Sequence, residues 1–266
     1  MTVHAPSGFG PVIPDWPDAP ANVGALATTR GGGFSGAPYD DGQGGGGLNL
    51  GLHCGDDAPT VQRNRALLES QLPGRPAWIA QVHGSTVIDA AAVGEGKPVL
   101  TGDASIATVP GVVCAVMTAE CLPVLFASLD GKVVGAAHAG WRGLAAGVLA
   151  QTILAMRAAG AGEITAWMGP AIGPAQFEVG MDVLDTFVAL SPASEEAQVR
   201  AAFRPYAGRE GKYLADIFAL ARLFLARDGV TRVSGGTYCT ATETARFYSY
   251  RRDHVTGRQA SLIWLK

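Results

Sequence analysis

The chain has 266 residues, of which 48% are hydrophobic and 16% are charged, so it can bury a substantial core. Its net charge of −3, without a run of basic residues, argues against binding to nucleic acid or to an anionic membrane. The most apolar stretch, residues 112–129, contains Glu120 and Pro123 and fits two buried strands better than a transmembrane helix. Segment 1–20 is rich in proline and lacks an apolar run, so we expect no secretory signal there. The 4 cysteines are widely spaced without a CxxC pair, which favours free thiols in a cytoplasmic protein.

The first part of the chain predicts one strand, a loop and one helix before two short strands. We expect a strand over residues 23–30, a glycine-rich loop over 31–47, a helix over 59–72 capped by Asp56 or Asp57, and strands at 78–82 and 86–90. Residues 31–36 match the pattern GxGxxG, but more glycine follows instead of a helix. This pattern therefore indicates a loop and not a dinucleotide fold.

The remaining part predicts a strand-rich middle followed by helices. We expect strands at 112–118, 122–129, 133–137, 164–168 and 260–265, one long helix at 144–159, and further helices at 182–190 and 214–227. No low-complexity linker or internal repeat divides the chain. We therefore predict that residues 1–266 form a single α+β domain, a layered α/β sandwich with mixed sheets.

The apolar runs on either side of Asp130-Gly131 predict a β-hairpin. If these two residues form the turn, Pro123 lies opposite His138 and Gly140 lies opposite Cys121. Cys121 and His138 then share one face of the hairpin as diagonal neighbours, with Cβ atoms roughly 7–8 Å apart. A register shift of one residue would place them on opposite faces.

Cys121, His138 and His83 together offer one thiol and two imidazoles, each beside a glycine or a turn. This is the ligand set of a catalytic zinc with an open fourth position. The alternative is a metal-free site in which Cys121 is a nucleophile and His138 its general base. Glu120 could transfer a proton in either chemistry, although strand alternation favours a side chain that points away from Cys121. The signature of zinc nucleoside deaminases, H-x-E…P-C-x-x-C, is absent from the sequence.

Several arginines are candidates for binding an anionic substrate. Arg142 follows His138 in a glycine-bounded turn whose backbone N–H groups would suit phosphate, and an ordinary strand–helix connection explains the turn equally well. Arg30 precedes the glycine-rich loop, and Arg251 follows two tyrosines near the C-terminus. Such pairs can stack on a base and bind phosphate, or they can form surface ion pairs.

The chain resembles the bacterial laccase-domain family, also called the multicopper polyphenol oxidase or peptidoglycan editing factor family and now described as purine nucleoside phosphorylases. The resemblance spans nearly the whole chain, with many matched segments in order. They are Thr28–Gly32, Leu48–Gly51, Gly55–Asp57, Gln81–Gly84, the TAECLPVLF segment at 118–126, the HAGWRG segment at 138–143, Gly169–Pro174, Phe177–Gly180, Phe247–Asp253 and Thr256–Trp264.

The resemblance implies a metal site at His83, Cys121 and His138 that holds zinc, with copper in the older oxidase description. It implies a fold similar to a cysteine-hydrolase-like toxin domain. It implies phosphorolysis of adenosine, guanosine, inosine and methylthioadenosine, deamination of adenosine, and for some members correction of peptidoglycan precursors. The family usually has Asp where this chain has Glu120, which changes the reach of that carboxylate.

Three other functions compete with a zinc-dependent purine nucleoside phosphorylase. The first is copper-dependent polyphenol oxidation, because one Cys and two His resemble a blue-copper site. A multicopper oxidase needs several histidine clusters, however, and the chain has only 5 histidines. The second is a cysteine amidase that uses Cys121 and His138 on peptidoglycan precursors. The third is a non-catalytic protein that retains an enzyme-like site. The oligomeric state is not predicted.

Overall fold

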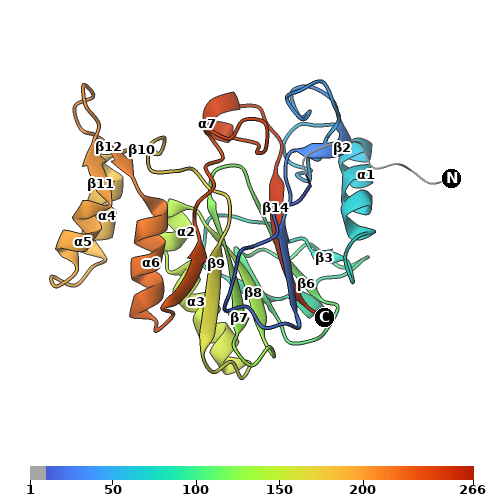
Figure 1. Cartoon of the computed structure of the whole chain (residues 1–266), viewed down its shortest axis with the longest axis horizontal. Helices are drawn as coiled ribbons and strands as arrows, with labels where there is room; N and C mark the ends of the chain where they lie inside the picture. Colours follow the sequence, from blue (N-terminus) through green and yellow to red (C-terminus); the bar gives the residue numbers. More distant parts are fainter. Residues whose placement is uncertain (1–9) are drawn as a thin grey trace.

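The computed structural model describes residues 10–266, and Figure 1 shows their arrangement. Residues 1–9, part of the segment in which no secretory signal is expected, lie outside the described residues. The helices are α1 (Ala58–Glu69), α2 (Trp141–Ala145), α3 (Val148–Ala158), α4 (Met181–Ala189), α5 (Glu196–Ala201), α6 (Ile217–Arg227) and α7 (Tyr250–Asp253), with a 3-10 turn η1 (Ala90–Ala92).

The described strands form three sheets, two of which build the body of the fold. In spatial order, the six-stranded sheet contains β13 (Arg232–Gly235), β9 (Ile164–Met168), β7 (Leu122–Ser128), β8 (Val134–Ala139), β5 (Ala104–Ala107) and β4 (Val87–Asp89). The four-stranded sheet contains β1 (Val23–Ala27), β14 (Gln259–Leu265), β6 (Val113–Thr118) and β3 (Pro76–Ala77). The small sheet contains β10 (Glu178–Gly180), β12 (Lys212–Ala215) and β11 (Phe203–Pro205), and β2 (Gly31–Ser35) lies outside all three.

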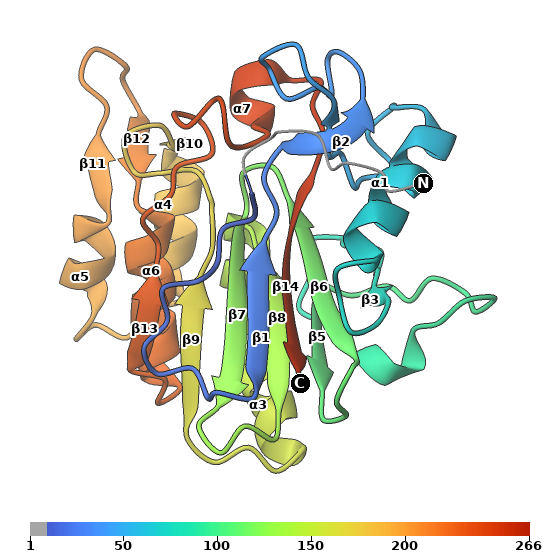
Figure 2. The ribbon, with the colours of Figure 1, turned by 45° about the vertical axis from the view of Figure 1, so that its right-hand side comes forward.

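The two large sheets pack face to face between helices, so the protein has a layered, mixed α/β fold (Figures 1 and 2). Strand β7 shows why, because both of its faces are buried. Val124 and Phe126 pack with α3 and α6, whereas Leu125 and Ala127 pack between the sheets with residues of β6 and β14. On the far side, the four-stranded sheet packs against Leu68 of α1. A strand covered on both faces is apolar throughout, as this one is.

Strands β6 and β7 follow each other in the sequence but belong to different sheets. The short turn between them, Ala119–Cys121, therefore crosses from one layer to the other. This turn carries Glu120 and Cys121, so two candidate site residues stand where the layers meet.

The predicted hairpin register is confirmed, with Pro123 opposite His138 and Leu122 opposite Ala139. The two-residue turn is wrong. The ladder ends where Ser128 N–H donates to Val133, and the four intervening residues form the loop. Gly131 has φ +67°, and Ser128 Oγ accepts from the backbone of Lys132 and Val133. The longer loop keeps the register because it adds one residue to each side.

The predicted helix over 144–159 is also wrong, because α2 ends at Ala145 and α3 begins at Val148. Gly147 separates them with φ +84°, in the left-handed region that interrupts a helix. The expected strand at 78–82 is wrong, because β3 covers only Pro76–Ala77 and a single bridge at Ala80 follows it. The helix expected at 214–227 begins only after the cap residue Asp216. The similarity to a cysteine-hydrolase-like toxin domain and the single domain over 1–266 stay predictions.

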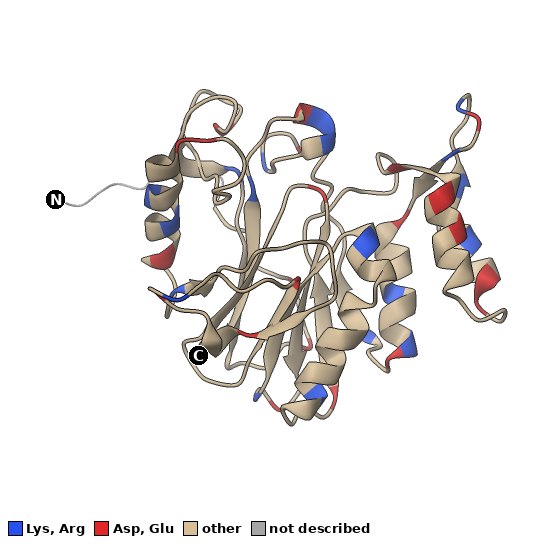
Figure 3. Cartoon of the chain, turned by 180° about the vertical axis from the view of Figure 1, so that it is seen from behind, with Lys and Arg blue, Asp and Glu red and all other residues tan. Residues whose placement is uncertain are grey.

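Positions of Lys and Arg and positions of Asp and Glu are interspersed along the helices and loops in Figure 3. The strands in this view carry few charged residues, as expected for layers buried on both faces.

Asn64 fastens α1 to the glycine-rich segment. Its fully buried amide nitrogen donates to Ser35 Oγ and to the carbonyls of Gly47 and Asn49, and its oxygen accepts from Phe34 N–H. These bonds hold a segment whose many glycines supply little packing of their own.

Replacing Asn64 by Leu is expected to lower the free energy of unfolding by about 3 kcal/mol, because buried backbone groups lose their partners. Urea denaturation followed by circular dichroism measures this loss. Gln62→Leu, on the exposed face of the same helix, is the matched control and should change stability little. Equal stability of the two variants would show that the Asn64 bonds contribute nothing net.

Candidate active site

The hairpin places two of the three expected ligands side by side. His138 lies near the end of β8 and is buried, and Cys121 immediately precedes β7 and is half-buried. A Cβ on Gly140, which follows β8, would lie only 2.6 Å from Cys121 Sγ and 3.2 Å from His83 Cδ2. A glycine at this position therefore leaves the space that the thiol and the imidazole occupy.

His83 comes from a loop between β3 and β4, far from the hairpin in the sequence. Its φ of +62° lies in the left-handed region, which a residue with a side chain adopts only when its surroundings impose it. Here the backbone N–H groups of Val82, His83 and Gly84 all donate to the carboxylate of Asp103, at 3.2, 2.8 and 2.7 Å. Successive N–H groups that converge on one anion form a nest, and this nest sets the conformation of the loop.

Asp103 also bonds to His138, with 2.9 Å between Oδ1 and Nδ1. Its carboxylate is fully buried. Burial by itself would raise the pKa of Asp103, but hydrogen bonds from His138 and from the three backbone N–H groups lower it. The bond to Nδ1 orients the ring and leaves Nε2 of His138 for a ligand bond, as carboxylates do for metal-binding histidines.

Asp103 is a residue of this site that the sequence patterns do not predict. The only local signal is a Gly-Asp pair just before the short apolar strand β5, which is typical of many turns. Its role depends on contacts with segments about twenty and thirty-five residues away in the sequence, which no spacing rule reveals.

One ligand atom from each of His83, Cys121 and His138 lies within 4.8 Å of the other two. The Cys121 Sγ to His83 Nε2 distance is 3.7 Å, and the two imidazole rings are 4.8 Å apart between centroids. His138 is buried, whereas His83 is exposed, so the group is open on one side. One sulfur and two nitrogens in reach of a common point suit a tetrahedral zinc with one open position.

The three side chains also shift each other's ionisation. Burial would raise the pKa of Cys121, but hydrogen bonds from His138 and His83 lower it to about 6. Burial would lower the pKa of His138, but hydrogen bonds to Asp103 and Cys121 raise it to about 9. Without a metal the site therefore holds a thiolate beside an imidazolium, whereas metal binding requires a neutral imidazole and releases the proton.

Glu120 faces α7. Its Oε1 accepts hydrogen bonds from Ser249 Oγ and from the backbone N–H of Arg251, while its buried Oε2 has no hydrogen-bond partner within residues 10–266. Burial raises the pKa of Glu120, and the bonds from Ser249 and Arg251 oppose that shift. The carboxylate is therefore held against the segment that closes over the β6–β7 turn.

The expected substrate-binding arginines differ in their surroundings. Arg30 is buried; its guanidinium donates to the carbonyls of Asp40 and Thr244 and lies over the Tyr248 ring. This geometry gives Arg30 a structural role and removes it from the substrate-binding residues that we propose. Arg142 is exposed on α2 over Trp141, and Arg251 is exposed on α7.

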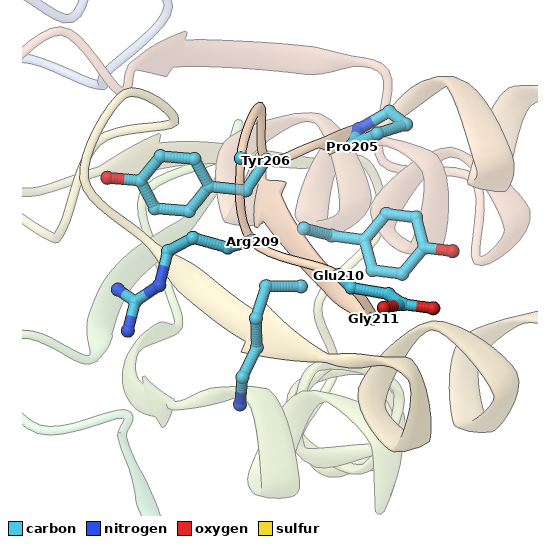
Figure 4. Close-up of a pocket in the computed structure, with 8 residues that line it drawn as sticks. Pro205, Tyr206, Arg209, Glu210 and Gly211 are labelled. Carbon is cyan, nitrogen blue, oxygen red and sulfur yellow. The ribbon is translucent and has the colours of Figure 1, made fainter.

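A pocket elsewhere on the surface lies at the turn between β11 and β12 (Figure 4). Tyr206, Arg209 and Lys212 are among the residues that line it, and none of the three ligand residues does.

Comparison with known proteins identifies the family of this chain. Residues 24–266 match a family described as multi-copper polyphenol oxidoreductase laccase. The chain is 52% identical over 255 residues to a purine nucleoside phosphorylase of Pseudomonas aeruginosa, covering 96% of this chain and 98% of that one. It is 49% identical over 256 residues to the Escherichia coli purine nucleoside phosphorylase YfiH, with the same coverage of each chain.

Two solved structures are similar to this chain over nearly its whole length. A Neisseria meningitidis protein superposes with a TM-score of 0.86 and 48% identity, over 97% of this chain and all of that one. YlmD from Geobacillus stearothermophilus superposes with a TM-score of 0.84 and 31% identity, over 97% of both chains. The chain belongs to the multi-copper polyphenol oxidoreductase laccase family, and its relatives from Pseudomonas aeruginosa and Escherichia coli are named purine nucleoside phosphorylases. In the part that the structure describes, no helix is long and apolar enough to cross a membrane.

Replacing Asp103 by Asn is expected to lower zinc affinity about 10- to 100-fold. The amide N–H groups would face the N–H groups that now donate to the carboxylate, so His83 and His138 would be held less firmly. Competition with a chromophoric chelator measures the affinity. Asp185→Asn, exposed on α4, should bind zinc like the wild type. Wild-type affinity in a folded Asp103→Asn protein would show that this carboxylate does not organise the site.

In metal-free protein, Cys121 should react with iodoacetamide at a nearly constant rate above pH 7 and more slowly below pH 6. The reason is that a thiol whose pKa is lowered to about 6 stays ionised above that pH. Peptide mass spectrometry at a series of pH values gives the rate. Cys54, whose pKa is raised by burial, should label slowly over the same range. An inflection for Cys121 near pH 9 would contradict the predicted thiolate.

Proposed function

We propose that this protein catalyses the phosphorolysis of purine nucleosides at the His83–Cys121–His138 site. The observation that carries the proposal is the convergence of these three ligands on one point, organised by Asp103, in a chain whose relatives across 96% of its length are named purine nucleoside phosphorylases. The substrates would be adenosine, guanosine, inosine or methylthioadenosine, together with inorganic phosphate.

The three residues fit a zinc ion, because a thiolate and two imidazoles are preferred zinc donors and their ligand atoms lie within 4.8 Å of one another. A bound zinc would supply Lewis acidity to a substrate oxygen. A copper ion also accepts a thiolate and two imidazoles. Within residues 10–266, however, this is the only group of at least three metal-ligating side chains found, which disfavours multicopper oxidation.

The chain's own residues would bind and orient the reactants. In phosphorolysis, a phosphate oxygen forms a bond to the ribose C1′ as the bond from C1′ to the purine nitrogen breaks, and the purine leaves protonated. Arg251, exposed beside the β6–β7 turn, would bind the phosphate, and Arg142 is a second cation on the HAGWRG segment. Asp103 would keep His138 and the His83 loop in place while the substrate is bound.

Deamination of adenosine to inosine is a second activity that we propose for the same residues. It needs water in place of phosphate, so the two activities would compete for one bound nucleoside. We place the protein in the cytoplasm, because all 4 cysteines are free, as in a reducing compartment.

A metal-free cysteine hydrolase is the second candidate, and one observation favours it. Cys121 and His138 form a thiolate–imidazolium pair of the kind that cysteine hydrolases use, with Asp103 as the third, orienting residue. Amide bonds of peptidoglycan precursors would be its substrates.

Adenosine incubated with the zinc-loaded protein is expected to give adenine and ribose 1-phosphate only when phosphate is present, as measured by chromatography of the products. Cys121→Ala should reduce the rate at least about 100-fold, because it removes one of three metal ligands. Cys54→Ala, a half-buried cysteine outside the ligand group, is the matched control. Inosine formed without phosphate would assign deamination to the site. Activity that survives strong chelation would favour the cysteine hydrolase, and product formation by Cys121→Ala at the wild-type rate would contradict the assigned site.

A further inference from the structure

The turn that carries Cys121 is bonded directly to α7. Tyr250 N–H donates to the carbonyl of Ala119 at 2.9 Å, and Arg251 N–H donates to Glu120 Oε1 at 3.2 Å. Ser249 Oγ also donates to that same oxygen. Neighbouring residues of one turn therefore have different roles. Cys121 belongs to the His83–Cys121–His138 group, whereas Glu120 holds α7.

Helix α7 needs such external bonds because it is only 4 residues long. A single helical turn fixes several backbone dihedrals for very few internal hydrogen bonds, so its position depends on its contacts. Ser249 is fully buried and caps the helix, with its Oγ accepting from Arg252 N–H at 3.2 Å. Because Ser249 Oγ bonds to both Glu120 and the helix, the carboxylate and the cap act as one unit.

The residue that this unit positions is Arg251. Its backbone N–H is held by Glu120, and at the other end its guanidinium Nη1 donates to the carbonyl of Glu178 at 3.0 Å and lies over the Phe177 ring. The side chain of Glu178 is in turn engaged by Arg209. Arg251 is thus exposed yet fixed at both ends, which suits a cation that must meet an anion in one orientation.

Glu120 is poorly placed to transfer a proton to a nucleoside. Its Oε1 already accepts two hydrogen bonds from α7, and its Oε2 is buried away from solvent. A general acid must come within hydrogen-bond reach of the reacting atom. The hydrogen bonds of the Glu120 side chain instead lead to the segment that carries Arg251.

We propose that Glu120 is a positioning residue, which holds α7 on the β6–β7 turn so that Arg251 is aimed at the phosphate co-substrate. This inference rests on the proposed function, because it assigns Arg251 to phosphate. In this chain the length of the side chain matters, because the carboxylate spans from the turn to both Ser249 and the Arg251 backbone.

The test compares E120Q and E120D in steady-state phosphorolysis with phosphate as the varied substrate. E120Q keeps an oxygen at Oε1 and is expected to keep KM for phosphate within about threefold of the wild type. E120D withdraws that oxygen by one methylene and is expected to raise KM for phosphate about tenfold, with a smaller change in kcat. Glu95→Asp, at a carboxylate 90% exposed, is the matched control for shortening a glutamate.

A double-mutant cycle with Arg251→Ala separates positioning from a general structural effect. If Glu120 acts through Arg251, E120D in the R251A background adds little to the KM of R251A alone. Fully additive effects would overturn the proposal. So would a loss of kcat of about 100-fold or more in E120Q with KM for phosphate unchanged, because that result indicates proton transfer.

A second measurement does not depend on activity. Hydrogen exchange of the peptide that contains residues 247–255 should be faster in E120D than in the wild type and unchanged in E120Q and in Glu95→Asp. If wild-type protein phosphorolyses no nucleoside, the proposed function fails, while faster exchange in E120D still supports the link between Glu120 and α7. Unchanged exchange in E120D would overturn that link even in an active phosphorylase.

Discussion

The site depends on the buried carboxylate of Asp103. It accepts three successive backbone N–H groups of the loop at 82–84 and, on the same side chain, bonds to Nδ1 of His138. A buried charge is stable only when it is well paired and hydrogen-bonded, and here the pairing joins two segments that carry metal-ligating side chains. The left-handed conformation of His83 and the orientation of the His138 ring both follow from this single group.

The architecture explains why these segments meet. Consecutive strands β6 and β7 belong to different sheets, so the turn between them crosses the layers and places Cys121 at their common edge. The β7–β8 pairing brings His138 back to the same edge, and the loop after β3 delivers His83 from the four-stranded sheet. The three residues His83, Cys121 and His138 thus come from segments of both sheets. Because these sheets are packed on both faces, they hold the three residues rigidly.

Arg30 and Arg251, two of the candidate substrate-binding arginines, differ in their surroundings. Arg30 is buried against backbone carbonyls and a tyrosine ring and supports the glycine-rich segment. Arg251 is exposed and fixed at both ends beside the turn that carries Cys121. Residue type and position in the chain do not distinguish the two, because the same guanidinium can satisfy backbone acceptors or bind an anion. The two arginines are distinguished by burial, because Arg30 is buried and Arg251 is exposed.

The sequence by itself determined the hairpin register and indicated that His83, Cys121 and His138 form one candidate metal site. Taking Asp130-Gly131 as the centre of the turn places Cys121 and His138 on one face of the hairpin, and the four-residue loop keeps that register because it has the same centre. The family also followed from the sequence, because its segments occur in order across the chain. Only the tertiary structure decided the role of Asp103, the contacts of Glu120, the burial of Arg30 and the break at Gly147. These features rest on contacts between segments distant in sequence, or on a backbone angle that such contacts select, and local patterns do not encode them.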